Sequence, residues 1–421
     1  MIKLVWRPFE ELYSIPLSNG LYKTAEFRGN GIKIINMGEL FEYSILDDVS
    51  MKRVTITDKE KQKFLIEKDD LIFARRSLKR EGAGKCSIIN TINEPTTFES
   101  SIIRVRLNKK IADPWFYYYF FNSKLGRNVM DGIIQQVAVS GIRGSDLSKL
   151  RVPYIPVEYQ VNCSKILKLL DFKILINTKI NYTLEQIAQT IFKHWFIDFE
   201  FPNENNKSYK SSGGKMKKCG NVLIPSEWKM CAFSEIREIS REYVNPNNFP
   251  DETFDHFSIP AYDDGQVPKI EEGKYIKSNK FCVTTNCVLL SRINPRIPRV
   301  WLPNIQPNRR AIASSEFLVM LPKSDISLEY LFVLCSSPSF MNSFSSLVTG
   351  STGSHQRANP DDIQIVKPAE TIIRKYTRIV YPLLQKIRIN HIESGYLRQM
   401  RDMLLSKLMI QEFKKMELMM D

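Results

Sequence analysis

Two stretches of the chain carry apolar residues three or four positions apart, which is the repeat of a helix packed along another helix. The first spans residues 156–200, and its predicted packing seam consists of Ile166, Leu169, Lys173, Ile176, Ile180, Leu184, Ile187 and Ile191. The second spans residues 369–421, with Leu383, Ile387, Leu397, Met400, Leu404 and Leu408 on its apolar face. Because a helix of about 40 residues is roughly 60 Å long, each stretch predicts a rod.

The remaining sequence has the pattern of two mixed α/β domains. Residues 1–155 and 221–368 carry short β-branched and aromatic runs separated by turn residues, as expected of many strands. Asp113 and Pro114 predict the cap and first turn of a helix. Residues 201–220 are rich in Gly, Ser, Asn and Lys and predict a flexible linker. The predicted fold class is α/β (mixed α+β), with two α/β domains in tandem, each followed by a long helix, and the helices in an antiparallel coiled coil.

Four residues refine the predicted helices. Pro202 is predicted to end the first one, because proline cannot continue the hydrogen-bond ladder of a helix. Pro382 is predicted to kink the second helix or to mark where its straight part begins. Asn390 and Ser394 are expected near the seam, where polar residues fix the register of paired helices at some cost in stability.

The two halves of the chain repeat the same pattern about 214 residues apart. The matched residues are Ser101 and Ser315, Val105 and Val319, Leu107 and Leu321, Asn177 and Asn390, and Leu184 and Leu397. A duplication of this size predicts approximate internal two-fold symmetry. Such a molecule suits a pseudo-symmetric partner, of which duplex DNA is the commonest.

Composition favours an anionic partner. Lys and Arg number 60 against 46 Asp and Glu, which gives a net charge of +14 and a pI near 9.3, and such an excess attracts nucleic acid through counterion release. The seven cysteines include no C-x-x-C pair, so we expect reduced packing residues and no metal site. The sequence begins without an apolar signal-peptide core and has no run of about 18 apolar residues. These features predict a soluble, cytoplasmic protein.

Base readout requires Arg, Lys, Asn, Gln or Ser on loops that can enter a DNA groove. Two polar, glycine-containing loops of the first α/β domain have this character, with the candidate DNA-binding residues Arg75, Arg76, Lys79, Arg80, Lys85, Gln135, Gln136, Ser140 and Arg143. The equivalent loops of the second domain supply Arg292, Arg296, Arg299, Ser351, Thr352, Ser354, His355, Gln356 and Arg357. A solvated loop or a plain capped turn is the alternative for each residue, but recurrence at equivalent places favours DNA.

Several spaced motifs resemble the specificity subunits of type I restriction-modification systems over essentially the whole chain. The first long helix is similar to the central conserved helix of that family, with Leu170-Asp171-x-Lys173-Ile174, Leu184-Glu185 and Trp195-Phe196-x-Asp198-Phe199. The end of the chain is similar to its C-terminal conserved helix, with Leu397, Arg401, Asp402, Leu404, Leu405, Lys407 and Leu408 in the expected places. The sequence around Trp228 resembles the opening of the family's second target recognition domain.

The resemblance implies a non-catalytic DNA-recognition subunit. Two target recognition domains, residues 1–155 and 221–368, would each read one half of an asymmetric bipartite site, while the helices set the spacing. The helices would dock two methyltransferase subunits that methylate adenine, and restriction and translocase subunits would join the complex. This chain would need no cofactor, since S-adenosylmethionine, ATP and Mg belong to the partner subunits. Four aromatic residues at the end of the first helix are interpreted as methyltransferase contacts: Phe192, Trp195, Phe196 and Phe199. Packing in the protein core is the alternative for these residues.

Two other readings stay open. The chain could be a free-standing DNA-binding or inhibitory protein that dimerises through its helices. Pro250-Asp251 followed by Glu272-Gly273-Lys274 has the residue order of a metal-dependent nuclease, although so loose a pattern often arises by chance. Co-purification with a methyltransferase separates the first reading from the specificity subunit, and metal-dependent cleavage by the isolated chain would favour the nuclease.

Overall fold

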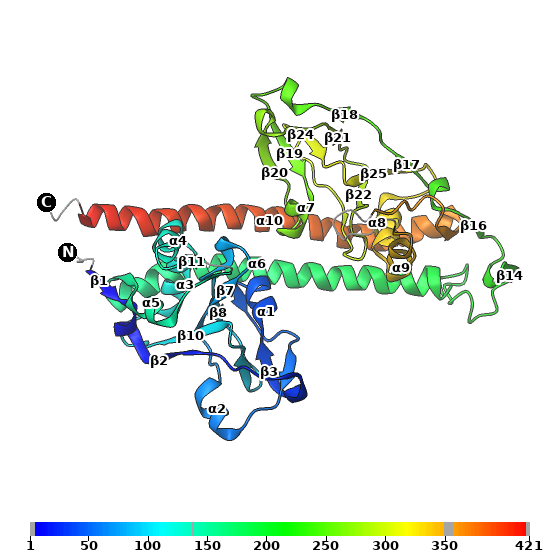
Figure 1. The fold of residues 1–421 in the computed structure, drawn as a ribbon. Helices are drawn as coiled ribbons and strands as arrows, with labels where there is room; N and C mark the ends of the chain where they lie inside the picture. The colour runs from blue at the N-terminus through cyan, green and yellow to red at the C-terminus, as the bar shows by residue number, and fades with distance from the viewer. Residues whose placement is uncertain (1–4, 137–138, 349–356, 418–421) are drawn as a thin grey trace. The chain divides into compact units, whose positions relative to one another are not determined.

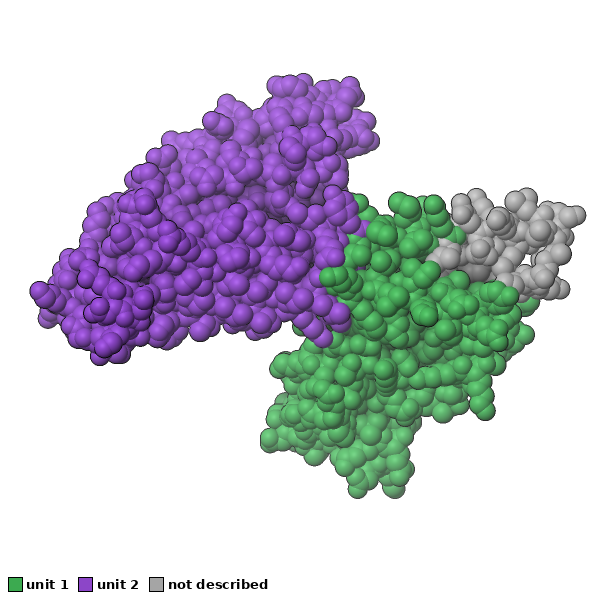
Figure 2. All heavy atoms as spheres, turned by 180° about the vertical axis from the view of Figure 1, so that it is seen from behind, with its two compact units in different colours: residues 1–173, 397–421 green, residues 174–396 purple. Residues whose placement is uncertain are grey.

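The computed structural model describes residues 5–136, 139–348 and 357–417 of the 421-residue chain. The chain divides into two compact units: unit 1 comprises residues 1–173 and 397–421, and unit 2 comprises residues 174–396 (Figure 2). Each unit combines an α/β domain with part of both long helices, so the predicted mixed α/β class is confirmed. Within the described ranges, no helix is both long enough and apolar enough to cross a membrane.

In unit 1, a five-stranded sheet forms the centre of the α/β domain. Its strand order is β2 (Tyr13–Asn19), β10 (Ile102–Leu107), β6 (Leu71–Ala74), β8 (Cys86–Ile89) and β4 (Ile45–Leu46). Smaller sheets join β5 (Lys52–Val54), β3 (Arg28–Ile35) and β9 (Thr96–Phe98), and pair β1 (Val5–Pro8) with β13 (Arg151–Tyr154). Strand β6 runs directly into the loop that begins at Arg75, so the central sheet positions one of the candidate loops.

An aromatic helix packs against this sheet. Helix α3 (Pro114–Asn122) begins as predicted, because the Asp113 carboxylate accepts a hydrogen bond from Phe116 N at 3.0 Å and Pro114 occupies the first turn. Its aromatic side chains are buried in one apolar cluster with residues of the central sheet. The other helices of this domain are α1 (Met37–Glu42), α2 (Asp58–Phe64), α4 (Lys124–Asp131) and α5 (Gly144–Lys149).

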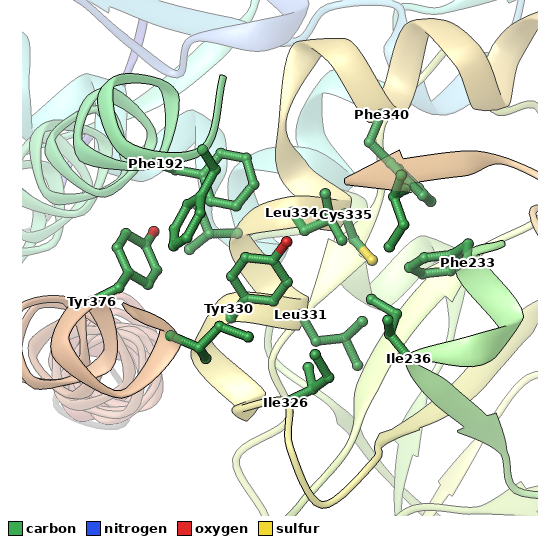
Figure 3. Packing of buried hydrophobic residues seen from close by; sticks show 14 of the residues in the cluster. Phe192, Phe233, Ile236, Ile326, Tyr330, Leu331, Leu334, Cys335, Phe340 and Tyr376 are labelled. Atoms are coloured by element: carbon green, nitrogen blue, oxygen red, sulfur yellow. The ribbon is translucent and has the colours of Figure 1, made fainter. Parts of the chain in front are cut away.

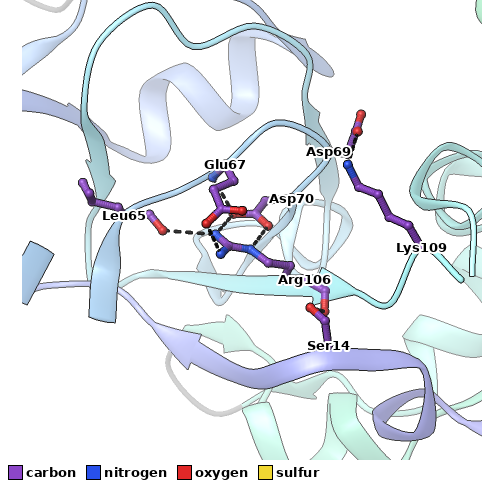
Figure 4. A network of polar contacts seen from close by, with 7 residues as sticks. All are labelled: Ser14, Leu65, Glu67, Asp69, Asp70, Arg106 and Lys109. Atoms are coloured by element: carbon purple, nitrogen blue, oxygen red, sulfur yellow. Dashed lines mark hydrogen bonds and ion pairs between the residues drawn. The ribbon is translucent and has the colours of Figure 1, made fainter. Parts of the chain in front are cut away.

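An ion-pair network fixes the loop that leads into β6 (Figure 4). Arg106 of β10 donates two hydrogen bonds to the Asp70 carboxylate, at 2.7 and 2.8 Å, and also pairs with Glu67. Asp70 is buried, and its burial raises the pKa of the carboxyl group although Arg106 acts in the opposite direction. A buried carboxylate with one bidentate partner depends strongly on that partner, so this contact holds β6 and β10 in register at the start of β6, and the Arg75 loop follows the other end of the strand.

Unit 2 repeats the arrangement. A four-stranded sheet has the order β17 (Arg237–Ile239), β25 (Phe317–Pro322), β22 (Val288–Ser291) and β23 (Val300–Trp301), and a five-stranded sheet has the order β18 (Tyr243–Val244), β21 (Lys280–Cys282), β24 (Arg310–Ala313), β19 (Thr253–Phe257) and β20 (Lys269–Glu272). The antiparallel pair β22–β25 corresponds to β6–β10, and β16 (Lys229–Ala232) pairs with β26 (Gln364–Lys367) as β1 pairs with β13. Its helices are α7 (Ile259–Asp263), α8 (Leu328–Ser336) and α9 (Pro338–Ser346). The sequence repeat is therefore a repeat of the fold.

The two long helices are α6 (Val157–Phe192), which continues as a π-helical turn over Lys193–Ile197, and α10 (Glu370–Glu417). The first helix ends before Pro202, because Phe199 lies in the left-handed region with φ +62° and turns the chain away. The prediction that Pro202 ends the helix is therefore wrong. Helix α10 runs on through Pro382.

Within each unit the two helices run antiparallel. In unit 1, Arg401 of α10 pairs with Asp171 of α6 at 2.8 Å, and Leu167 and Leu405 share one apolar cluster. Residue numbers thus rise along α6 as they fall along α10. The antiparallel pairing expected from the sequence is confirmed.

In unit 2 the antiparallel helices meet through polar side chains. Asn177 donates to Glu393 at 2.8 Å and to Ser394 at 3.3 Å, and Asn390 donates to Asn181 at 2.7 Å. All except Glu393 are buried, so the expected positions of Asn390 and Ser394 near the seam are confirmed. Such contacts favour one register, because a slipped pairing would leave buried amides without partners.

The predicted packing seam of α6 is wrong for most of its residues. Its exposed members, with exposed fractions of 37–61%, are Ile166, Leu169, Ile176, Ile180 and Ile187. The buried face instead carries Leu167 and Asp171 in unit 1, and Asn177, Asn181 and Ala188 in unit 2. Polar residues occupy much of this inner face of α6. The apolar residues that repeat every three or four positions lie mostly on the outer, exposed face of the helix.

Residues 201–220, predicted as a flexible linker, form a structured segment of unit 2. The Phe201 ring stacks on Tyr209 with a centroid distance of 4.5 Å and on Trp228 at 4.8 Å. Strand β14 (Met216–Cys219) pairs with β15 (Val222–Pro225). Stacked aromatic rings and a hairpin replace the expected structureless linker.

Candidate DNA interface

The two candidate loops of unit 1 meet in a small sheet. Strands β11 (Gln135–Gln136), β12 (Ser140–Gly141) and β7 (Arg76–Ser77) are antiparallel neighbours in that order, and Ile142 N donates to Arg75 O at 3.0 Å. Figure 1 shows β7 and β11 in this domain. The loop that follows β6 and the loop that precedes α5 therefore form one polar surface.

The equivalent loops of unit 2 are joined in the same way. Ile293 and Arg357 form an antiparallel bridge, and Ala358 N donates to Arg292 O at 3.1 Å. The same pairing in two domains with different loop sequences makes it a feature of the repeated fold. The candidate residues that lie outside the described residues are Ser351, Thr352, Ser354, His355 and Gln356.

The first arginine of each loop pair is an anchor. Arg75 Nη1 donates to Ser100 O at 3.3 Å, and Arg292 Nη2 donates to Ser315 O at 2.9 Å. In both units the guanidinium binds the turn before the central strand, β10 or β25. Both arginines are partly buried, so their main contacts hold the loops in shape.

The other cations of the first loop differ in exposure. Arg76, Lys79 and Arg80 are exposed, which leaves their side chains accessible to a phosphate or a base edge. Lys85 is partly buried, and its Nζ donates a hydrogen bond to Phe41 O at 2.7 Å. Burial lowers the pKa of its amino group. Lys85 therefore ties the loop to α1.

In the second loop of unit 1, the exposed candidates are Gln135 and Arg143. Gln135 Nε2 donates to Asp146 at 3.2 Å, and Arg143 directly precedes α5. Ser140 is 4% exposed within the β12 pairing, so the expectation that its side chain contacts DNA is corrected to a supporting position. The side chain of Gln136 lies outside the described part of the chain.

In unit 2, Arg296 and Arg357 are exposed, and Arg357 pairs with Glu316 at 2.7 Å. Arg299 is 9% exposed, and its Nε and Nη2 donate to the two carboxylate oxygens of Asp263 at 2.7 and 2.9 Å. A bidentate pair of this kind occupies the guanidinium. The prediction that Arg299 contacts DNA is therefore wrong, and the residue braces the loop.

The aromatic residues at the end of α6 lie in the core of unit 2. Phe192, Trp195, Phe196 and Phe199 are 2–8% exposed and share one apolar cluster with Tyr376. Figure 3 shows Phe192 beside Tyr376 and Tyr330, and the Phe196 ring lies 5.0 Å from that of Tyr376. Their interpretation as methyltransferase contacts is corrected, because other residues of unit 2 cover these rings. The alternative, packing in the core of unit 2, agrees with the structure.

Exposed apolar residues occur elsewhere on the long helices. Helix α6 exposes Ile166 and Leu169 in unit 1, and Ile176, Ile180 and Ile187 in unit 2. Helix α10 exposes further large side chains: Ile379, Tyr381, Ile389 and Tyr396 in unit 2, and Met400 and Met403 in unit 1. Exposed apolar surface of this kind is typical of contact with another protein. Sequence reasoning found the α6 residues through their periodicity but placed them on the inner face.

The nuclease-like residues do not form a metal cluster in the described ranges. Among residues 5–136, 139–348 and 357–417, no group of three or more His, Cys, Asp or Glu side chains is arranged to hold a metal ion. Asp251 is exposed, and Lys274 forms an ion pair with Glu272.

Comparison with known sequences connects these loops and helices to a described family. Residues 9–186 match the type I restriction modification DNA specificity domain. The type I restriction enzyme MjaIX specificity subunit of Methanocaldococcus jannaschii is 24% identical over 319 residues, covering 72% of this chain and 70% of the relative. The type I restriction enzyme HindI specificity subunit of Haemophilus influenzae is 22% identical over 417 residues, covering 82% and 86%.

A solved structure shares the fold. The S subunit of a type I restriction-modification system from M. genitalium matches with a TM-score of 0.52 at 15% identity, over 97% of this chain and 96% of that one. The likeness therefore extends over both α/β domains and both long helices.

Proposed function

We infer that this chain belongs to the specificity subunits of type I restriction-modification systems and provides DNA sequence recognition within such a system. The family match, two relatives that cover 72% and 82% of the chain, and the shared fold support this inference. The structural observation that carries it is the repeated pairing of two polar loops, at Arg75–Ile142 in unit 1 and Arg292–Ala358 in unit 2. The free-standing DNA-binding alternative is not favoured.

The loops supply two kinds of contact. Exposed Arg76 and Lys79 in unit 1 and Arg296 in unit 2 neutralise phosphates and set the orientation on the duplex. Gln135 and Arg143, also exposed, donate to base edges. The loops of each unit read one half of an asymmetric, bipartite site.

Partner subunits carry the chemistry. Two methyltransferase subunits dock on the long helices, and the exposed apolar residues of α6 and α10 support that contact. Adenine methylation, and restriction with ATP-driven translocation, take place on partner subunits, and this chain directs them to the site without a catalytic group or cofactor of its own.

The test compares two substitutions in the complex with the methyltransferase. Arg143→Ala is expected to relax one position of one half-site, at a cost on the order of 1–3 kcal/mol for the cognate site. Lys79→Ala is expected to weaken cognate and unrelated DNA equally and to reduce the salt slope of binding by about 1. Lys59→Ala, an exposed cation on α2, is the control and should do neither. An unchanged site preference in Arg143→Ala would contradict its base-reading role.

A further inference from the structure

In unit 1, a polar cluster that includes the guanidinium of Arg401 connects the two long helices with α3. Arg401 of α10 donates to Asp171 Oδ1 of α6 at 2.8 Å, and the Tyr119 hydroxyl of α3 donates to Asp171 Oδ2 at 2.8 Å. Arg401 also pairs with Asp402 at 2.8 Å. Asp171 and Tyr119 are buried, so the three elements are joined by one closed polar cluster.

The helices of unit 2 carry small or apolar residues at the equivalent positions. Along the two helices, the spacing between the repeats makes Ala188 the counterpart of Arg401 and Leu384 the counterpart of Asp171. Unit 2 therefore lacks both the guanidinium and the carboxylate that unit 1 uses in this place.

The third member of the cluster is also replaced. Helices α3 and α8 begin at equivalent caps, Asp113 and Ser327, so Val333 is the counterpart of Tyr119. Replacing Tyr by Val removes a ring and a hydroxyl group, and replacing Arg by Ala removes a long side chain. Both changes leave space in unit 2.

That space is a cavity of about 160 Å³ lined by Ala188, Val333 and Leu384. Glu185 of α6 also lines it, and its side chain makes no hydrogen bond or ion pair with any residue that the structure describes. Burial raises the pKa of the Glu185 carboxyl group to about 6. At neutral pH the cavity thus contains an ionised carboxylate that forms no ion pair with the residues described in the structure.

We propose that this cavity binds a small organic cation, an alkylguanidinium or alkylammonium, whose charged head pairs with the Glu185 carboxylate. Its short alkyl chain lies against Ala188, Val333 and Leu384. In unit 1 the same place holds a guanidinium of the chain itself, which shows the kind of group that the fold accommodates. A partly buried carboxylate without a partner gains most from a cation that also donates hydrogen bonds.

A second acceptor lies beside the carboxylate. Gln189 lines the cavity, and its Nε2 donates to Val333 O at 3.0 Å. This bond orients the side-chain amide, and the amide oxygen can accept a hydrogen bond from the ligand. The proposal does not depend on the DNA-binding function.

The experiment titrates ethylguanidinium chloride into the full-length chain at pH 7.5 and follows binding by saturation-transfer NMR. Neutral ethylurea, which has nearly the same shape, is the matched probe. We expect ethylguanidinium to bind at least about tenfold more tightly than ethylurea, and Glu185→Gln to weaken its binding about tenfold or more, because a charge-assisted contact is lost.

Two further variants complete the test. Ala188→Met fills the cavity with an unbranched side chain and should abolish binding, whereas Glu204→Gln, at an exposed glutamate of unit 2, should leave it unchanged. Circular dichroism establishes that each variant is folded. Equal binding of ethylurea, or unchanged binding to Glu185→Gln or Ala188→Met, would overturn the proposal.

Unit 1 provides a reciprocal measurement. Arg401→Ala removes the guanidinium beside Asp171, and ethylguanidinium is then expected to raise the melting temperature of this variant more than that of the unsubstituted chain. Absence of this rescue would count against the argument that a guanidinium is the group that fits.

Discussion

At the scale of single residues, the burial of Glu185 makes the stability of the folded chain depend on pH. Its carboxyl pKa is about 6 in the folded chain and 4.5 in its ordinary environment, and burial is the cause. Tyr262 of α7 also lines the cavity, with a pKa that burial raises to about 12, and the neighbouring Asp263 is paired with Arg299. Because the folded state holds the proton more tightly, the Glu185 contribution to the free energy of unfolding is fully present below about pH 4.5. It is lost as the pH rises through about 6.

We therefore expect Glu185→Gln to raise the free energy of unfolding at pH 7.5 by about 1–2 kcal/mol, with a smaller effect at pH 5. Urea denaturation followed by tryptophan fluorescence at both pH values measures this difference. Glu204→Gln, at an exposed glutamate, is the control. A loss of stability in Glu185→Gln at pH 7.5 would show that the charged form is favoured in the folded state.

Arg299 and Arg296 lie in one loop but are expected to have different roles: Arg299 stabilises the loop, and Arg296 contacts DNA. Arg299→Ala is expected to lower the free energy of unfolding by about 1–2 kcal/mol, because it leaves Asp263 without its bidentate partner. Arg296→Ala, at an exposed position, should leave stability unchanged and weaken DNA binding at low salt. Urea denaturation and DNA titration of both variants make the comparison. The reverse assignment of the two effects would restore Arg299 as a DNA contact.

At the scale of elements, the helix pair of unit 2 depends on its buried amides. Asn390 Oδ1 is already buried without a hydrogen-bond partner, and Asn181→Leu would also leave Asn390 Nδ2 unpaired. We expect a loss of about 1–3 kcal/mol for Asn181→Leu and a recovery of most of it when Asn390→Leu is added. A double-mutant cycle in urea measures the coupling. Strictly additive losses would mean that the two amides do not act as a pair.

The paired helices also set the spacer of the recognised site in the proposed function. Inserting seven residues after Ile174 of α6 together with seven before Leu397 of α10 keeps the antiparallel partners matched. The insertion adds about 10 Å to the pair, which is roughly three base pairs of DNA. We expect the tolerated spacer to lengthen by about this amount with both half-sites unchanged, as read from the methylated motif. An unchanged spacer would contradict the role of the helices.

The local sequence predicted where helices begin better than it predicted which face of a helix is buried. The cap of α3 follows from Asp113 and Pro114 alone, because both act on the adjacent turn. The inner face of α6 could not be predicted in this way, because Asp171 and Asn177 face partners more than 200 positions away in the sequence. Periodicity shows that one face is apolar but not which face is covered.

The same limit applied to the candidate loops and to the segment after α6. Charge and glycine content located the loops, yet the carboxylate of Asp263, which occupies Arg299, belongs to another element. Phe201 and Tyr209 are ordered by stacking that also involves Trp228, which follows the segment. Such roles depend on tertiary contacts that a local pattern does not contain.

At the scale of the whole molecule, two repeated α/β domains with different loops are suited to a site with two different halves. Residues 221–368 form the second target recognition domain in the proposed function. Exchanging this segment for that of a related subunit should change one half-site and leave the other half-site intact. Methylation mapping of the exchanged complex reports both halves at once. A change in both halves would show that the domains do not read independently.

The most direct measurement is single-molecule sequencing for N6-methyladenine in cells that express this chain with its methyltransferase, compared with cells that lack this chain. The specificity-subunit function predicts a bipartite, gapped motif that is methylated only when the chain is present. Absence of any gapped motif, with the methyltransferase shown to be expressed, would contradict it.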